Sequence, residues 1–316
     1  MAFTQTSSLS VDQAAFDQIA YFALRSELLF DAAADVQPVA QSMPGTSVAF
    51  TIFSELADAT ATLTETVDVT AVAMADSQVT VTLAEYGNAI NTTAKLRGTS
   101  FLDVDTVAAN LIGYNAGSSI DTVVANVLKG AANIVFGSGG STTPTSNATV
   151  QSDDILAADD IRVVTAQLRG SKAQTFNGMY MAFIHPDVSY DLRRETGAAA
   201  WRDAHNYQNI GPIYNGEIGA FEAVRFVETP RAPLNLTGGS SSTVDLYQTL
   251  IMGRQSLAKA HSITDGNGAF PKVVRGPVVD SLMRFNPMGW YWLGGYGIFR
   301  EAALRSINSS SSLGGA

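Results

Sequence analysis

Apolar side chains recur every three or four residues in several stretches of the chain, which is the spacing of one face of an α-helix. The first stretch starts at Ser10, with Gln13 at the spacing of a capping box. The predicted helices cover residues 10–29, about 103–130, 159–170, 186–193 and 201–207. Gly113 and Gly117 lie in the middle of the second helix and cost about 1 kcal/mol each relative to alanine. We therefore expect that helix to need tertiary support or to bend there.

Shorter runs rich in valine, threonine and aromatic residues predict β-strands. These strands cover residues 48–53, 64–72, 79–83, 180–184, 221–227, 246–252 and 273–279. Two Ser/Gly-rich stretches follow neither pattern. Residues 137–146 are expected to form a flexible loop, and the tail at 308–316 is expected to be disordered. The mixture of helices and strands predicts an α+β fold.

The composition is that of a globular protein with a weakly charged surface. Of its 316 residues 46% are hydrophobic, and 15% are charged against about 25% in a typical domain. A chain of this length buries roughly three quarters of its unfolded surface, enough for two subdomains. The low charge suggests that much of the surface is buried against other copies. The absence of cysteine excludes disulfides, thiolate nucleophiles and cysteine-ligated zinc.

Negative charge is concentrated in the first half of the chain. Residues 1–160 carry a net charge of −14, and residues 161–316 a net charge of +4. No lysine or arginine lies between Arg25 and Lys95. That stretch holds the acidic residues Glu27, Asp31, Asp35, Glu55, Asp58, Glu65, Asp68, Asp76 and Glu85. The split suggests that the front half of one copy lies on the back half of another. A solvated acidic face that serves solubility explains the charge about equally well.

Nothing in the sequence points to export, a membrane or a tight grip on nucleic acid. Residues 1–10 lack the cationic and apolar regions of a secretory signal, and no apolar run reaches the roughly 20 residues of a membrane span. The pI is near 4.7 and there is no basic cluster, so strong phosphate binding is not expected. We expect synthesis in a cytoplasm with no evident export.

The three histidines are the obvious candidates for a chemical site. His185 precedes Pro186 at a strand-to-helix junction, where it or Asp187 is expected to cap the helix rather than to act in catalysis. His205 and His261 are isolated, and no pair of histidines has metal-ligand spacing.

Other signatures of enzymes are also missing from the sequence. There is no phosphate-binding loop, nucleophile elbow or dinucleotide fingerprint. The carboxylate pairs at 153–154 and 159–160 lie where a helix begins, a place that the helix dipole favours without any function. We therefore expect no catalytic residue, no metal site and no cofactor, and predict that the protein is not an enzyme.

The back half of the chain carries motifs whose order and spacing resemble those of a known family. Residues 178–193, Gly-Met-Tyr-Met-Ala-Phe-Ile-His-Pro-Asp-Val-Ser-Tyr-Asp-Leu-Arg, and residues 216–229, Gly-Glu-Ile-Gly-Ala-Phe-Glu-Ala-Val-Arg-Phe-Val-Glu-Thr, are similar to segments of tailed-phage major capsid proteins of the N4-gp56 family. Residues 83–90, 250–253 and 280–290 resemble further segments of that family in the same order. Departures from the family pattern are Ala223 for glycine, Ser281 for proline and Tyr291 for lysine.

The resemblance implies the HK97-type capsid fold, with its parts in a fixed order along the chain. It implies an N-terminal arm at 1–45, an extended β-hairpin loop at 46–85, a peripheral domain at 86–175 with a spine helix at 104–130 and return strands at about 266–290, an axial domain at 176–265, and a C-terminal strand with a disordered tail at 291–316. We call residues 46–85 the extended loop. In that fold it lies over a neighbouring subunit.

The function that the resemblance implies is that of the major capsid protein of a tailed bacteriophage. Copies would assemble as pentamers and hexamers into an icosahedral shell around double-stranded DNA, without sequence-specific binding and without a membrane. The expected location is the virion, after assembly in the host cytoplasm. Expected partners are a scaffolding protein, a portal and a cement protein, the first because no long helical segment precedes the arm. Some relatives cross-link through a lysine of the extended loop, and here that loop has none.

Charged side chains of the extended loop and of the expected axial domain are the candidates for contacts between subunits. They are Glu55, Asp58, Glu65, Asp68, Arg193, Arg194, Glu217, Glu222 and Arg225. As exposed single charges they would contribute less than about 1 kcal/mol each, and that interpretation stays open. Trp290 and Trp292 are expected in the core rather than at an interface.

Two other functions fit the sequence. An encapsulin-like compartment would have the same fold and load cargo enzymes instead of DNA, and co-purified nucleic acid or a cargo peptide would separate the two. A soluble hydrolase of an unrecognised α+β fold is the less favoured alternative. A monomer that turns over a model substrate would support it.

Overall fold

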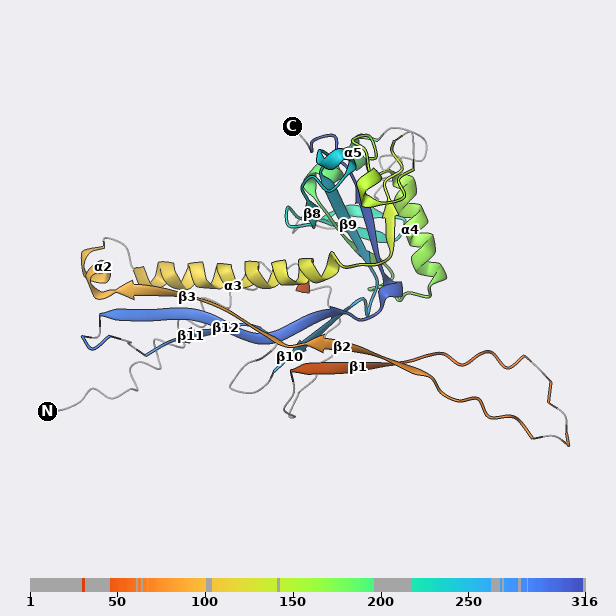
Figure 1. The fold of residues 1–316 in the computed structure, drawn as a ribbon, viewed down its shortest axis with the longest axis horizontal. Coiled ribbons are helices and arrows are strands. Elements are labelled where there is room, and N and C mark those ends of the chain that lie inside the picture. Colours follow the sequence, from red (N-terminus) through yellow and green to blue (C-terminus); the bar gives the residue numbers. More distant parts are fainter. Residues whose placement is uncertain are drawn as a thin grey trace.

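The computed structural model describes residues 30–31, 46–60, 62–63, 65–66, 68–100, 104–140, 143–195, 217–262, 268, 270–277, 280–282 and 284–314. The predicted helices at 10–29 and 201–207 lie outside these residues. The described chain has an elongated part and a more globular part, and the extended loop projects from the region where they meet (Figure 1).

The elongated part is a four-stranded antiparallel sheet with a long helix along it (Figure 1). Its elements are β3 (Ala84–Thr93), α2 (Ala94–Thr99), α3 (Val104–Leu128), β10 (Leu257–His261), β11 (Lys272–Arg275) and β12 (Phe285–Ile298). Strand β12 is central. It pairs with β3 along one edge and with β10 and β11 at successive stretches of the other.

Helix α3 is a single helix of 25 residues that depends on the sheet for support. Gly113 and Gly117 lie among its buried residues, so tertiary packing offsets their low helix propensity, as expected. Trp290 and Trp292 of β12 are buried in the adjoining core, which confirms their prediction as core residues. The indole Nε1–H of Trp290 donates to Asn115 Oδ1 of α3 at 2.9 Å.

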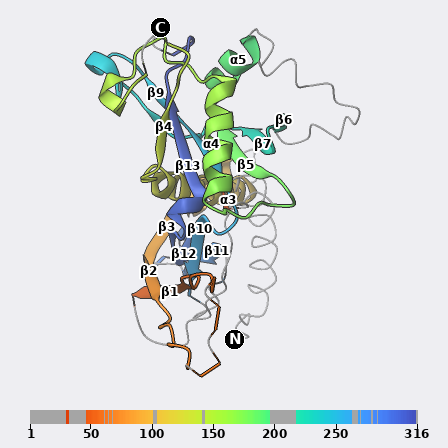
Figure 2. The same cartoon turned by 90° about the vertical axis from the view of Figure 1, so that its right-hand side faces the viewer.

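The globular part is built on a seven-stranded mixed sheet, and in Figure 2 helix α4 lies in front of its strands. Its strands are β4 (Ile134–Phe136), β5 (Tyr180–Ile184), β6 (Glu217–Phe221), β7 (Val224–Glu228), β8 (Leu234–Asn235), β9 (Leu246–Met252) and β13 (Leu304–Ser309). Its helices are α4 (Ala158–Gly170), α5 (Pro186–Arg194) and the 3₁₀ turns η2 (Asn147–Thr149), η3 (Ser240–Ser242) and η5 (Glu301–Ala303). The strand order is β4-β13-β9-β5-β7-β6, with β8 on β9.

The apolar face of α4 closes one side of this sheet. Ile161, Val164 and Leu168 are fully buried and belong to the same core as Ala182 and Ile184 of β5. Helix α4, expected within 86–175, therefore packs on the globular sheet, whereas β10, expected within 176–265, pairs in the elongated sheet. Packing thus groups segments that are separated along the chain.

Most of the predicted elements within the described residues are confirmed. Helices α3, α4 and α5 match the predictions at 103–130, 159–170 and 186–193, and strands form at 47–53, 76–82, 180–184 and 246–252. The strand predicted at 273–279 is shorter, because β11 ends at Arg275 before a Gly-Pro pair.

One strand prediction is wrong, and another is confirmed only in part. The strand predicted at 64–72 is not formed among the described residues there, because no neighbouring strand pairs with it. The strand predicted at 221–227 is confirmed at 224–227 as part of β7, but its first residues form the end of β6 and a turn. Glu222 and Ala223 have φ values of 50° and 64°, which place both in the left-handed region of a two-residue turn between β6 and β7.

The prediction of a disordered tail is also wrong. Asn308 and Ser309 end β13, and Ser310 and Ser311 are buried. The hydroxyl of Ser311 and the backbone N–H of Ser312 donate to the buried carboxylate of Asp191 at 2.9 and 2.8 Å. Composition alone suggested disorder, but these serines satisfy a buried acid and are held in place by it.

Candidate functional site

The base of the extended loop is a short hairpin fixed to the body. Strand β1 (Ser47–Phe53) pairs antiparallel with β2 (Asp76–Thr82). Alternate residues face opposite sides, so Val48 and Phe50 are buried with Val81 against Ala258 and Ala260 of β10. The Phe50 ring lies edge-on to Phe299, with centroids 5.9 Å apart.

Glycines of β12 allow the hairpin to pass close to the sheet. A Cβ atom at Gly295 would collide with the carbonyl oxygen of Thr82 in β2. A Cβ atom at Gly297 would lie 2.8 Å from Val81 Cγ2. The loop therefore leaves the body at a place where only glycine leaves room for it.

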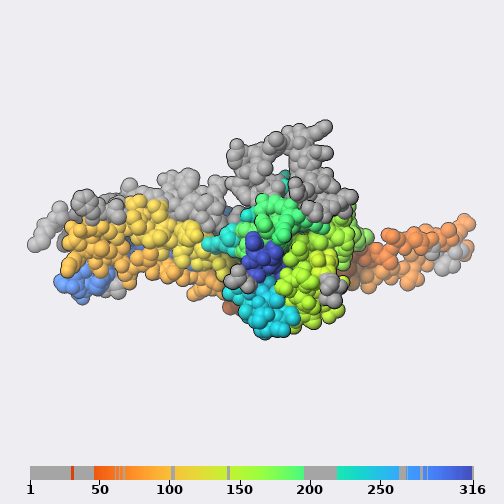
Figure 3. All heavy atoms as spheres, turned by 90° about the horizontal axis from the view of Figure 1, so that it is seen from above, coloured from red at the N-terminus to blue at the C-terminus, as the bar shows by residue number. Residues whose placement is uncertain are grey.

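The outer part of the loop, which we call the tip (residues 54–75), is supported among the described residues only by a hydrogen bond at its base and an exposed ion pair of Glu55. The hydrogen bond from Ser54 N–H to Ala75 O, 2.9 Å long, closes the hairpin, and no strand is formed beyond it among the described residues. Figure 3 shows the loop as a narrow projection beyond the body. Large apolar side chains of the tip face solvent: Leu56, Leu63 (78% exposed), Val69, Val72 and Met74 (73% exposed). An apolar surface of this kind is typical of a contact that another chain completes.

Four of the nine predicted contact residues lie on the tip. Asp58 and Glu65 are exposed, and Asp68 accepts a hydrogen bond from the N–H of Val69 at 2.8 Å. Glu55 instead pairs with Lys172 of the same chain, with Nζ and Oε2 2.8 Å apart. The hydrogen bond and charge of Lys172 lower the pKa of Glu55. Both side chains are almost fully exposed, so the pair is a weak tether.

The other five lie on the globular part, away from the tip. Arg193 bonds the backbone oxygen of Ser189 and lies 3.6 Å from Glu228, and Glu222 pairs with Arg162 at 3.3 Å. Arg194 lines a groove with Asp191, Glu195 and Ser312. Arg225 is exposed on β7, and Glu217 begins β6. Within one chain the structure brings the nine into two separate groups and not into one site.

A buried charge cluster ties the segment before the loop to the body. Lys259 of β10 is 1% exposed, and its Nζ donates to both carboxylate oxygens of Asp31 at 2.7 and 2.8 Å. The Tyr296 hydroxyl donates to Asp31 Oδ1 at 2.7 Å. Burial lowers the pKa of Lys259, while Asp31 opposes that shift, and burial followed by the nearby Asp31 charge raises the pKa of Tyr296. Phe30, fully buried, packs on Phe183 with centroids 4.6 Å apart.

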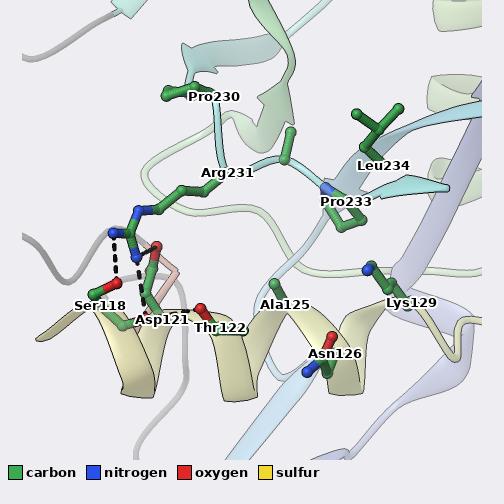
Figure 4. Close-up of a pocket in the computed structure, with 11 residues that line it drawn as sticks. Ser118, Asp121, Thr122, Ala125, Asn126, Lys129, Pro230, Arg231, Pro233 and Leu234 are labelled. Atoms are coloured by element: carbon green, nitrogen blue, oxygen red, sulfur yellow. Dashed lines mark hydrogen bonds and ion pairs between the residues drawn. The ribbon is translucent and has the colours of Figure 1, made fainter. Parts of the chain in front are cut away.

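A groove of about 380 Å³ runs between α3 and the segment before β8 (Figure 4). Arg231 reaches across it, with Nη2 2.7 Å from Ser118 Oγ and Nη1 3.7 Å from Asp121 Oδ2. Asp121 is fully buried and also accepts the N–H of Phe30 at 3.1 Å. The Asp121 carboxylate thus joins helix α3 to the segment of Phe30 and to the segment of Arg231. In this groove Arg231 holds both Ser118 and Asp121, which describes a structural junction.

The histidines within the described residues have structural roles. His185 caps α5, accepting the N–H of Asp187 on Nδ1 at 3.3 Å, which confirms the capping prediction. Burial lowers its pKa, with Asp187 and Glu228 opposing the shift. His261 is buried beside Lys259, and burial followed by the Lys259 charge lowers its pKa. His205 lies outside the described residues.

Other polar groups in the described residues hold the backbone. Asp160 Oδ2 accepts the N–H groups of Ala157 and Ser138 at 2.9 and 3.0 Å, which fixes the start of α4. Where the structure describes the chain, no three histidine or acidic side chains gather as metal ligands would. None of the described helices is both long and apolar enough to cross a membrane.

Sequence analysis missed the Asp31–Lys259 cluster. Lys259 stands in Leu-Ala-Lys-Ala-His, where a lone cation among small apolar residues is a signal of burial with a partner. Its partner lies 228 residues away and has no local signal. Among the exposed apolar residues of the tip, Val69 and Val72 lie in the strand predicted at 64–72, and Leu56, Leu63 and Met74 lie outside it.

Comparisons with known proteins agree on the kind of fold. A family described as "Phage capsid protein" matches residues 5–310. The chain is similar to the capsid of Ralstonia phage GP4, with TM-score 0.72 and 16% identity over 91% of this chain and 90% of that chain. It is similar to the Cyanophage Pam1 capsid, with TM-score 0.68 and 16% identity over 89% of each chain. It also resembles the head structure of Helicobacter pylori bacteriophage KHP40, with TM-score 0.65 and 10% identity over 88% and 87%. No curated protein matches. At these identities the likeness establishes the fold, and the predicted HK97-type capsid fold is confirmed.

Proposed function

Because this chain belongs to the phage capsid protein family, we propose that it is the major capsid protein of a tailed bacteriophage, present in many identical copies that close into a shell. Closure requires one surface of each copy to meet a complementary surface of the next with a fixed rotation. The protein would be structural, with no catalytic role, and its place would be the virion after assembly in the host cytoplasm.

The tip of the extended loop is the observation that carries this proposal. It exposes large apolar side chains, has no cation and forms no strand with its own chain among the described residues. A projection of this kind gains nothing in an isolated subunit. It becomes favourable when a second copy covers its apolar side chains and supplies positive charge.

The finer features of the assembly are part of the same proposal. Copies would form pentamers and hexamers of an icosahedral shell around double-stranded DNA, and the chain would be a relative of the N4-gp56 capsid proteins. The arm and the extended loop would occupy the predicted ranges, whereas α4 would belong to the axial domain and β10 to the peripheral domain, because each packs there. A scaffolding protein, a portal and a cement protein would be the further partners. An acidic wall would suit this role, because it would not hold the packaged DNA tightly.

The nine contact residues fall into two groups that this assembly would bring together across copies. Asp58, Glu65 and Asp68 of one tip would face cations of the next subunit. Arg193, Arg194 and Arg225 would supply positive charge at the contacts of the globular part, with Glu217 and Glu222 as acidic partners. Glu55 would keep or exchange its bond to Lys172 on assembly.

The test is the assembly state of the full-length chain. We expect the purified protein to form closed particles in negative-stain microscopy and to sediment as a large species. Replacing Leu63, Val72 and Met74 by serine should reduce particle yield at least about tenfold, because their burial between copies is lost, and should leave the melting temperature of the free subunit unchanged.

Leu282 provides the matched control, since it is 71% exposed and lies on the elongated part. Leu282→Ser should assemble as the natural protein does. A wild-type chain that stays a compact monomer at high concentration would refute the proposal. Particles that enclose a protein cargo and no DNA would favour the compartment alternative.

A further inference from the structure

The hydrogen-bond pattern of the extended loop stops abruptly. Strands β1 and β2 pair in continuous register from Ser47 opposite Thr82 to Phe53 opposite Asp76. Beyond the bond between Ser54 and Ala75 the tip has two limbs, which we call the first limb (residues 54–60) and the second limb (residues 68–75). The described residues of these two limbs make no further backbone bond to each other. Figure 1 shows the second limb running out as an extended chain. Among the described residues its backbone donors and acceptors from 68 to 74 have no backbone partner, and the N–H of Val69 bonds the Asp68 carboxylate.

The second limb nevertheless has the composition of a strand. Residues 68–75 read Asp-Val-Thr-Ala-Val-Ala-Met-Ala, with β-branched and apolar residues and no glycine or proline. With a period of two, Thr70, Val72 and Met74 share one face, and the small Ala71 and Ala73 lie on the other with Val69. Val72 and Met74 are 71% and 73% exposed, so the larger face has no cover in the described chain.

The first limb is drawn away from this potential strand. Continuing the β1–β2 register would place Glu55 opposite Met74, but the Glu55 carboxylate is held by Lys172 at 2.8 Å, beyond α4. Both limbs are also acidic, and neither carries a cation that would draw them together. The partner that completes the second limb therefore has to come from elsewhere.

We propose that residues 68–75 of one copy bind a second copy of this chain as an added β-strand, through backbone hydrogen bonds along one edge. Strand addition needs an extended segment with free backbone groups and an alternating apolar face, and the second limb has both. Charge selects another copy as the partner, because residues 161–316 carry a net charge of +4 against −14 in residues 1–160. This inference rests on the proposed function only for the identity of the partner.

Hydrogen exchange followed by mass spectrometry tests the inference on the full-length chain. In free subunits the amides of 69–75 should exchange at nearly unprotected rates. In particles they should exchange at least about a hundredfold more slowly, at every second residue, because only one edge of the segment is paired. Uniform protection, or protection already present in free subunits, would overturn the inference.

Proline variants supply an independent readout, since proline removes one backbone donor and leaves the charge unchanged. Ala71→Pro and Val72→Pro remove neighbouring donors that point to opposite edges. At least one should reduce particle yield about tenfold or more, while the control Ala59→Pro on the first limb stays within about twofold of the natural protein. Free-subunit melting temperatures should not change.

The possible failures are distinguishable. If the wild-type chain forms no particles, the proposed function is refuted and this partner with it. If particles form while the amides of 68–75 remain in fast exchange, or if neither proline variant impairs assembly, only the strand addition is refuted. Equal damage from Ala59→Pro would show that the tip responds to any stiffening and would also overturn it.

Discussion

Removing the carboxylate of Asp31 should destabilise the subunit strongly, because it leaves a buried cation without its partner. Lys259 is 1% exposed and donates to both oxygens of Asp31, and the Tyr296 hydroxyl shares one of them. The Lys259 ammonium group also lies 4.9 Å from the ring centroid of Phe270 and 5.5 Å from that of Tyr296. Those rings stabilise the cation only partly.

The magnitude follows from the cost of breaking a buried ion pair, about 3–5 kcal/mol. An unfolding entropy of about 2.1 cal/mol/K per residue converts that cost into a fall in Tm of about 5–8 °C for a chain of this length. The double variant Asp31→Ala/Lys259→Met should recover much of the loss, since it removes both charges from an apolar site. Asp58→Ala, which removes an exposed carboxylate of the tip, should change the stability by less than about 0.5 kcal/mol.

The pH dependence gives a second check on the same variant. Burial holds the pKa of Lys259 below its ordinary 10.5, and without Asp31 it falls further. The penalty of Asp31→Ala is thus fully present below the folded-state pKa of Lys259 and fades as the pH rises toward 10.5, where the neutral amine needs no counterion. Urea denaturation of free subunits, followed by circular dichroism from pH 7 to 10, measures this. A loss below about 1 kcal/mol, or a double variant no better than the single one, would refute the reasoning.

Three further predictions concern other parts of the fold. Burial lowers the pKa of both His185 and His261, so the unfolded state takes up protons first and stability should fall as the pH drops below 6.5. In thermal melts the stability of His261→Gln should fall less steeply below that pH, and an unchanged slope contradicts the prediction. Deleting residues 310–316 leaves the buried Asp191 carboxylate without the serine donors and should cost about 3 kcal/mol in urea denaturation, whereas a cost below about 1 kcal/mol would show that the tail is dispensable. Ala223→Gly should raise the stability by about 0.5–1 kcal/mol, because φ is 64° at this turn, and any loss of stability would argue against that strain.

Local patterns alone determined the helices and most strands. The apolar spacing of α4 and the Pro186 start of α5 specify these helices wherever they pack, because capping and periodicity act within a few residues. The absence of lysine and arginine between Arg25 and Lys95 likewise marks the extended loop as an unusual segment in the sequence alone. The sequence predicts a strand at 64–72, and the propensity of that segment is that of a strand, but a strand also needs a neighbour that propensity does not supply.

Tertiary structure decided what depends on partners distant in sequence. Asp31 meets Lys259 across 228 residues, and Ser311 meets Asp191 across 120, so no local signal identifies the partner in either case. The close passage of β2 over Gly295 is likewise a property of two chain segments in space. Helix and strand preferences depend on residues that are adjacent in the sequence. Burial and charge compensation depend on which segments meet, and only the folded chain brings those segments together.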